Sequence, residues 1–140
     1  MSDSVVKTEA TIAEVLARAR GRLERLTPQR AAEEFADGAV LVDIRPQAQR
    51  AREGEIPGSW VIERNVLEWR FDPSCPARLA IASDRELRIV VFCSEGYTSS
   101  LAAASLHELG LRRATDMIGG FVAWQAAGLS TVAGGRAADG

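Results

Sequence analysis

Cys93 stands between an apolar run and an alanine-rich run, at the start of a loop of small and polar residues. The loop reads Cys-Ser-Glu-Gly-Tyr-Thr-Ser. If a strand precedes Cys93 and a helix follows it, the free N–H groups and the dipole of that helix favour a thiolate at this position. Gly96 would let the loop curl, so that further backbone N–H groups converge on an anion. These residues predict a nucleophilic cysteine; the alternative is a small buried residue that ends a strand.

Two apolar, β-branched runs predict the strands that must position this loop. Residues 89–92 lead directly into Cys93, and residues 39–44 lie between a glycine and a proline. Both runs are short and continuous, as in strands that are buried on both faces of a parallel sheet. Cys93 then falls at the carboxyl end of its strand, which is the edge at which open α/β sheets bind ligands.

Helical periodicity and capping signals predict the remaining elements. Apolar spacing indicates helices over residues 11–25 and 99–109, and Thr27 followed by Pro28 marks the start of another, shorter helix. Strands that alternate with helices predict an α/β domain with a mostly parallel sheet. Because residues 1–10 and 131–140 lack this patterning, we expect two flexible tails around a single domain over residues 11–130.

Composition narrows the function. The 140 residues include 17 Lys and Arg against 19 Asp and Glu, and the net charge of −2 indicates neither a nucleic-acid nor an acidic-membrane partner. No apolar run is long enough to cross a bilayer, and no secretory signal is visible. Two cysteines do not make a disulfide scaffold, so we expect a cytoplasmic protein. A single histidine, His107, argues against a histidine-based metal site, and we expect no metal.

Four stretches, in order along the chain, resemble the motifs of the rhodanese family. CSEGYTS at 93–99 is similar to the family's Cys-x-x-Gly-x-Arg-Ser active loop. LVDIRP at 41–46, GEIPGS at 54–59 and IGGFVAWQAAGL at 118–129 resemble its first core strand, its Gly-His-Ile-Pro-Gly turn and its Gly-Gly-x-x-x-Trp closing helix. The resemblance implies a three-layer α/β domain, with a mostly parallel sheet of about five strands and helices on both faces. The helix over residues 11–25 would be an extra N-terminal element.

The resemblance also implies a chemistry. Rhodanese-like sulfurtransferases take a sulfane sulfur from thiosulfate or a low-molecular-weight persulfide as a cysteine persulfide, and they pass it to a thiol or to cyanide. In this chain the carrier would be Cys93, with no metal or organic cofactor. The loop amides would stabilise the thiolate, the persulfide and the leaving anion. The residues that would form this substrate-binding loop are Ser94, Glu95, Gly96, Tyr97, Thr98 and Ser99.

Three positions depart from the family pattern. Thr98 stands where the loop arginine is expected, Glu95 adds an acid, and Glu55 replaces the turn histidine. Since arginine binds oxyanions in a bidentate way, its loss predicts weaker thiosulfate binding and argues against phosphatases that use a Cys-x5-Arg loop. Arg45 or Arg64 is our candidate for supplying the missing charge, and the alternative is that both are structural or surface ion-pair residues.

Four further residues have two interpretations each. Asp43, at the end of its strand, is expected to accept hydrogen bonds that brace neighbouring loops, or simply to cap the strand. Tyr97 and Trp60 could wall a pocket or pack as ordinary aromatic residues. Cys75 could resolve an oxidised Cys93 into a disulfide, or it could be an ordinary residue of a proline-flanked loop.

Two functions from different classes remain open at this point. The first is a cytoplasmic sulfurtransferase that uses a small sulfur donor and a thiol or cyanide acceptor. The second is a non-enzymatic rhodanese-like module that binds a partner or senses oxidants through Cys93. A homodimer and an acceptor protein are the protein partners that the sequence leaves open.

Overall fold

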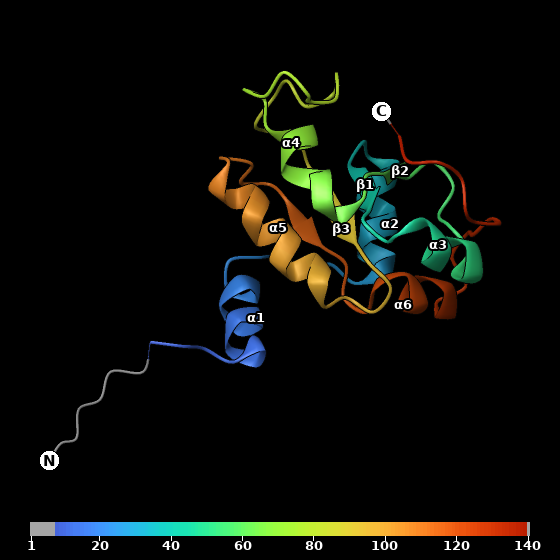
Figure 1. Ribbon diagram of the computed structural model, residues 1–140. Coiled ribbons are helices and arrows are strands. Elements are labelled where there is room, and N and C mark those ends of the chain that lie inside the picture. The colour runs from blue at the N-terminus through green and yellow to red at the C-terminus, as the bar shows by residue number, and fades with distance from the viewer. Residues whose placement is uncertain (1–7, 140) are drawn as a thin grey trace, which may run out of the picture.

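Four parallel strands form the centre of the fold (Figure 1). The computed structural model describes residues 8–139. The strands are β1 (Val40–Asp43), β2 (Trp60–Val61), β3 (Ile89–Phe92) and β4 (Thr115–Asp116), in the order β2-β1-β3-β4. β1 and β3 pair along their whole length, so that the last residues of the two strands lie side by side. The strands predicted from the two apolar runs, 39–44 and 89–92, are therefore the two central strands of the sheet.

The sheet has four strands where about five were predicted. A single residue occupies the fifth position, because Leu26 makes a parallel bridge with Met117 directly after β4. Thr27 and Pro28 follow at once and begin helix α2 (Pro28–Ala36), and proline has no N–H with which to extend a ladder. The early start of α2 therefore limits this edge of the sheet to one bridge.

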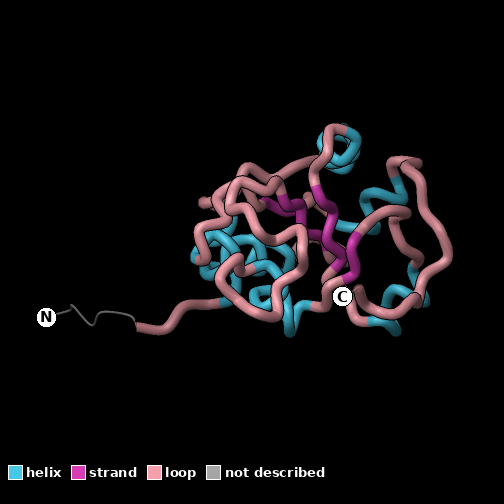
Figure 2. The backbone as a smooth tube through the Cα atoms, turned by 90° about the horizontal axis from the view of Figure 1, so that it is seen from above, coloured by secondary structure: helices cyan, strands magenta, loops and turns pink. Residues whose placement is uncertain are grey.

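Helices cover both faces of the sheet, which confirms the predicted three-layer arrangement (Figure 2). Alternate side chains of β3 enter two separate buried clusters, one on each face. One cluster includes side chains of α4 (Leu67–Phe71) and α5 (Thr98–Glu108), and the other includes side chains of α2 and α6 (Gly120–Ala126). Burial on both faces explains why this strand is apolar throughout.

Helix α1 (Ile12–Arg20) packs against α5 and is shorter than predicted (Figure 1). A capping box between Thr11 and Glu14 begins it, as each side chain bonds the backbone of the other. The sequence predicted a helix over residues 11–25, but it ends at Gly21, a residue that costs helix stability. Beyond it the chain follows an irregular path to the bridge beside β4.

The other helical elements are short connections. Helix α3 (Gln47–Glu53) follows β1, and a 3₁₀ turn (Arg64–Val66) leads into α4. Of the tail predicted over residues 1–10, residues 1–7 lie outside the described residues, and residues 8–10 form no helix or strand. None of the helices in the described part of the chain is both long and apolar enough to span a membrane.

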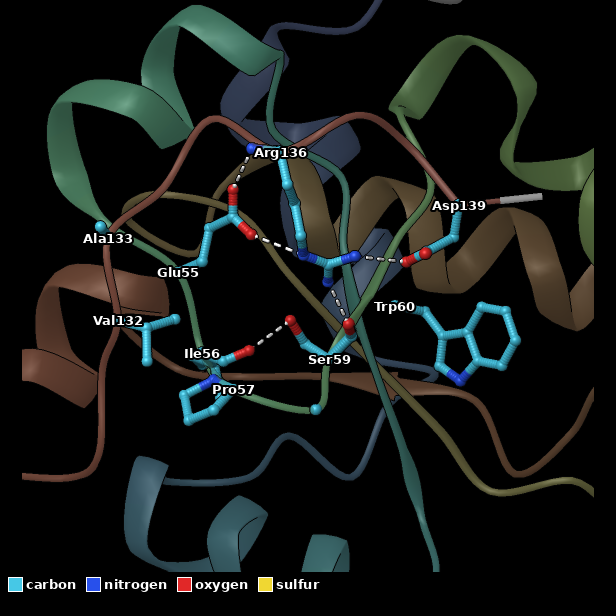
Figure 3. A pocket seen from close by; sticks show the side chains of 10 residues that line it. Glu55, Ile56, Pro57, Ser59, Trp60, Val132, Ala133, Arg136 and Asp139 are labelled. Atoms are coloured by element: carbon cyan, nitrogen blue, oxygen red, sulfur yellow. Dashed lines mark hydrogen bonds and ion pairs between the residues drawn. The ribbon is translucent and has the colours of Figure 1, made fainter.

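The C-terminal residues pack against the turn at Glu55, although the sequence predicted a flexible tail from residue 131 (Figure 3). Backbone groups of Glu55 pair with this tail in antiparallel fashion, at N···O distances of 2.9 and 2.8 Å. The Glu55 side chain is buried and accepts hydrogen bonds from Arg50 at 3.0 Å, Gly135 N–H at 2.7 Å and Arg136 Nε at 2.8 Å. A buried carboxylate needs such donors, and the tail supplies most of them. The glutamate at the position of the turn histidine is therefore one of the residues that hold the tail against the domain.

Glu55→Gln is expected to lower the free energy of unfolding at pH 7 by about 2–4 kcal/mol, because buried donors lose their carboxylate. Burial by itself raises the pKa of Glu55, but the hydrogen bonds from Gly135, Arg50 and Arg136 outweigh it and hold that pKa below its ordinary value. A depressed pKa stabilises the fold above the unfolded-state pKa, and this stability is lost as the pH falls through the folded-state pKa. Urea unfolding at neutral and at acidic pH should therefore show a difference between wild type and variant that narrows in acid.

Glu33→Gln is the matched control, since Glu33 is exposed and its ion pair with Arg30 is exposed as well. This control should stay within about 0.5 kcal/mol of wild type throughout. If the loss caused by Glu55→Gln were the same at both pH values, the Glu55 charge would not be what holds the tail.

Candidate active site

Cys93 lies directly after β3, at the carboxyl edge of the sheet. Its Sγ accepts a hydrogen bond from the N–H of Gly96 at 3.3 Å, and the residue is 6% exposed. Helix α5 begins at Thr98, so the loop from the cysteine leads straight into a helix N-terminus. A sulfur that faces a backbone N–H beside a helix start is well placed to hold negative charge.

The first turn of α6 fixes the backbone of this loop from the other side. Phe121 N–H donates to the Cys93 carbonyl at 2.8 Å, and Val122 N–H donates to the Ser94 carbonyl at 3.0 Å. At Gly120 an added Cβ would lie 2.4 Å from the Cys93 carbonyl oxygen, so no side chain fits between the helix and the loop. The paired glycines of the closing-helix motif thus allow a close approach of two backbones.

A hollow of about 390 Å³ opens beside the thiol. Its lining combines the active loop with the end of α3, and the residues are Gln49, Glu53, Cys93, Ser94, Glu95, Tyr97 and Thr98. Two carboxylates line the hollow, and no lysine or arginine in residues 8–139 does. Tyr97 is exposed and lines the hollow. The predicted loop residue Ser99 is instead buried, and its hydroxyl donates to Asp116 at 2.8 Å.

Arg45 is fully buried and takes part in a chain of polar contacts that ends at the active loop. Its Nε and Nη2 donate to the two Asp43 oxygens at 2.9 and 2.6 Å, and its Nη1 donates to Glu53 at 3.0 Å. The Ser94 hydroxyl donates to the same Glu53 carboxylate at 2.9 Å. The structure therefore joins the predicted brace Asp43 to the loop through Arg45 and Glu53, and it does not bring the Arg45 guanidinium into the hollow.

The charge state of Arg45 follows from its partners. Burial lowers the pKa of its guanidinium, but the hydrogen bonds and charges of Asp43 and Glu53 outweigh this effect and raise the pKa above its ordinary value. Burial acts on Asp43 as well, where it raises the pKa of the carboxyl group against the opposing bonds from Arg45. Arg45 and Asp43 form a fully buried ion pair, and Asp43 also accepts a hydrogen bond from the Arg45 backbone N–H.

Three other candidates lie away from the hollow. Arg64 pairs with Glu68, one helical turn further along the chain, at 2.9 Å, and it does not line the hollow. Trp60 borders a separate hollow beneath the C-terminal tail (Figure 3). Cys75 is free and half-buried beside Trp69, and it does not line the hollow of Cys93 either.

The sequence analysis missed five polar residues that shape the site. Glu53 and Gln49 come from α3, which the sequence indicated only as the stretch after the first core strand. The other three contact the loop or the start of α5 from outside and are Arg20, Arg25 and Asp116. No local pattern marks them, because their partners lie far away in the chain. Among the described residues, no group of three or more His, Cys, Asp or Glu side chains could hold a metal ion.

Comparisons with known proteins agree with this arrangement. A family model described as the rhodanese-like domain matches residues 27–127. The chain is 32% identical over 103 residues to a thiosulfate sulfurtransferase GlpE of Ectopseudomonas mendocina, covering 74% of this chain and 85% of that protein. It is 33% identical over 97 residues to a sulfurtransferase of Allochromatium vinosum, covering 69% of this chain and 81% of that protein.

Solved structures extend the match beyond the family model. A protein of unknown function from Rhodopseudomonas palustris, described as a possible tyrosine phosphatase, has a TM-score of 0.80 and 32% identity, and covers 94% of this chain and 98% of that one. A thiosulfate sulfurtransferase of Pseudomonas aeruginosa has a TM-score of 0.63 and 25% identity, and covers 82% of this chain and 21% of that chain. The first match reaches well outside residues 27–127 and so takes in part of the N-terminal segment.

Gly96→Ala tests the shape of the loop. Gly96 has a φ of +85°, and an added Cβ would lie 2.7 Å from the N atom of Gly119. We expect a loss in free energy of unfolding of about 2–4 kcal/mol, the sum of a left-handed backbone and a clash with fixed backbone atoms. Urea unfolding measures this loss directly.

Gly128→Ala is the control for that loss, since Gly128 has a similar φ of +76° and open space around its Cα. The control carries the backbone cost alone, about 1–2 kcal/mol. If Gly96→Ala and Gly128→Ala lost the same free energy of unfolding, the loop backbone would be shifting to accommodate the added methyl group without a clash.

Proposed function

Because the chain belongs to the rhodanese-like domain family and is a sulfurtransferase of that family, we propose that it carries sulfane sulfur as a persulfide on Cys93. The observation that carries this proposal is the Cys93 thiol, which meets the Gly96 N–H and borders an open hollow at the carboxyl edge of the sheet. Such a site gives a nucleophile access to a small donor and gives the product anion hydrogen-bond donors.

The reaction has two steps, transfer of sulfur from the donor to Cys93 and from Cys93 to the acceptor, and needs no external oxidant or reductant. The Cys93 thiolate attacks the outer sulfur of the donor, a new S–S bond forms, and the old S–S bond breaks with its electron pair on the leaving thiolate or sulfite. Cys93 then carries one extra sulfur as a persulfide anion. An acceptor thiolate or cyanide attacks that outer sulfur, and the Cys93 thiolate leaves and is ready for another cycle. Hydrogen bonds from the loop amides stabilise the anion on sulfur in both steps.

The charges around the hollow support a persulfide rather than thiosulfate as the preferred donor. Glu53 and Glu95 line the hollow, and Thr98 occupies the place of the oxyanion-binding arginine. Thiosulfate bears its oxyanion directly on the sulfur that leaves, and this group finds no bidentate partner in the hollow. A low-molecular-weight persulfide needs only its outer sulfur at the thiol. The acceptor would be a thiol, and the requirement for a free Cys93 suits the reducing cytoplasm.

Intact mass tests this proposal directly. Reduced protein is incubated with thiosulfate or with glutathione persulfide, beside the variants Cys93→Ser and Cys75→Ser. We expect one added sulfur, reversible by dithiothreitol, that forms faster with the persulfide, disappears in Cys93→Ser and persists in Cys75→Ser. A folded protein that gains no sulfur from either donor would overturn the proposal, and equal rates with both donors would overturn the donor preference.

Thr98→Arg is expected to restore thiosulfate recognition. Thr98 is exposed at the rim of the hollow, so a longer side chain has room there. A charge-assisted hydrogen bond contributes about 1.5–3 kcal/mol, so kcat/KM for thiosulfate should rise about tenfold or more, with little change for glutathione persulfide. Thr98→Met controls for size without charge and should give no gain. An equal gain in Thr98→Met would contradict the electrostatic explanation.

A further inference from the structure

Two arginines of the N-terminal segment share one acceptor on the active loop. Arg20, the last residue of α1, donates from Nη2 to the Gly96 carbonyl oxygen at 2.8 Å. Arg25 donates from its own Nη2 to the same oxygen at 2.9 Å. The family model begins at residue 27, so both arginines lie outside the part of the chain that it matches. A carbonyl that accepts two guanidinium groups is held in one orientation.

Each arginine is itself held in place. The Arg20 Nε donates to the Ser100 hydroxyl, in the first turn of α5, at 3.1 Å. Arg25 donates to both oxygens of Asp116 at 2.8 and 3.1 Å, and its side chain is only 16% exposed. Asp116 is fully buried on β4 and also accepts the Ser100 hydroxyl at 2.8 Å. The two guanidinium groups are therefore part of a network that joins α1, the loop, α5 and β4.

The orientation of the Gly96 carbonyl determines where the N–H of the next residue, Tyr97, points. The peptide bond to Tyr97 is trans, as are all others in the described residues, so its N–H points opposite to its C=O. Because the Gly96 carbonyl oxygen accepts hydrogen bonds from Arg20 and Arg25, the Tyr97 N–H points to the opposite side of the peptide plane, away from both guanidinium groups. The N–H of Gly96 meets the Cys93 sulfur at the same time. Withdrawal of electron density by two cations also makes the following N–H a stronger donor.

The network leaves positive charge next to a loop that lacks its own arginine. Asp116 balances the charge of Arg25, with which it pairs, and Arg20 adds a second guanidinium, which lies 5.6 Å from the centre of the Tyr97 ring. Both guanidinium groups lie behind the loop, on its Gly96 carbonyl, and they do not line the hollow. They can therefore hold the loop in place without binding the donor.

We propose that Arg20 and Arg25 are positioning residues for the active loop: by holding the Gly96 carbonyl from outside the family domain, they fix the loop conformation in which the Gly96 N–H meets the sulfur on Cys93. This inference rests on the proposed sulfur transfer for its kinetic consequence. Its consequence for thiol reactivity is independent of that function.

The test compares Arg20→Ala, Arg20→Lys and the control Arg22→Ala. Arg22 lies on the same segment but forms an exposed ion pair with Glu108. For Arg20→Ala we expect kcat with glutathione persulfide to fall about tenfold while KM changes less than about twofold, because loop geometry acts on the charge that develops during transfer. Alkylation of Cys93 by iodoacetamide, followed by peptide mass, should slow as well. Arg20→Lys keeps a single cationic group that can reach the Gly96 carbonyl, so it should recover part of kcat and part of the alkylation rate. The control Arg22→Ala should match wild type in both.

A second variant guards against misfolding. Arg25→Lys keeps a charge opposite the buried Asp116 but loses the planar fork that spans two acceptors, so it should reproduce the fall in kcat with little change in urea unfolding. The inference is overturned if Arg20→Ala retains wild-type kcat and alkylation, if Arg22→Ala loses as much, or if the losses only follow the unfolded fraction. If no variant nor wild type transfers sulfur, the proposed function fails, and the alkylation rates alone decide on the positioning role.

Discussion

The close contact between the first turn of α6 and the loop after β3 is the constraint on which the site depends. Two backbone N–H groups of the helix bond the carbonyls of Cys93 and Ser94, and this is possible only because Gly119 and Gly120 carry no side chains. At Gly119 an added Cβ would lie 2.5 Å from the Cβ of Ala123, and at Gly120 it would meet the loop itself. With the carbonyls of Cys93 and Ser94 bonded to α6, the loop directs the Gly96 N–H to the sulfur. The glycine pair, distant in sequence from the cysteine, is thus part of the same structural unit.

Buried ion pairs then connect this unit to the rest of the sheet. Arg45 links β1 to the end of α3, and its Nη2 also donates to the Gly54 carbonyl at 2.8 Å. Because Glu53 accepts both Arg45 and the Ser94 hydroxyl, its carboxylate is engaged in holding the loop and is a poor candidate for a general base. Such pairs add specificity of arrangement more than net stability, since each buried charge must first lose its water.

Those features of the fold that depend on neighbouring residues in the chain could be predicted from the sequence. The apolar runs at 39–44 and 89–92, the Thr27 cap and the Cys93–Gly96 spacing yield the central strands, α2 and the place of the loop. The rest depends on partners that are far apart in the chain. Arg45 has the charge expected of a substrate ligand, yet Asp43 and Glu53 bind it in the interior. The Gly- and Ala-rich C-terminus has the composition of a flexible tail, yet a buried carboxylate on another segment orders it. Arg20 and Arg25 look like part of a solvated helix face until the fold brings Gly96 beside them.

The ordered tail has one more effect, on the open side of the sheet. β2 is the edge strand next to β1, and an edge strand exposes backbone groups to which a foreign strand can bond. At Val61 both groups are already taken, because its N–H donates to the Asp139 carboxylate at 2.7 Å and its carbonyl accepts the Asp139 N–H at 2.8 Å. Asp139 thus pairs with Val61 as a residue of a neighbouring strand would, and its charged side chain continues no further ladder. This contact leaves fewer free backbone groups on the edge strand to which a foreign strand could bond.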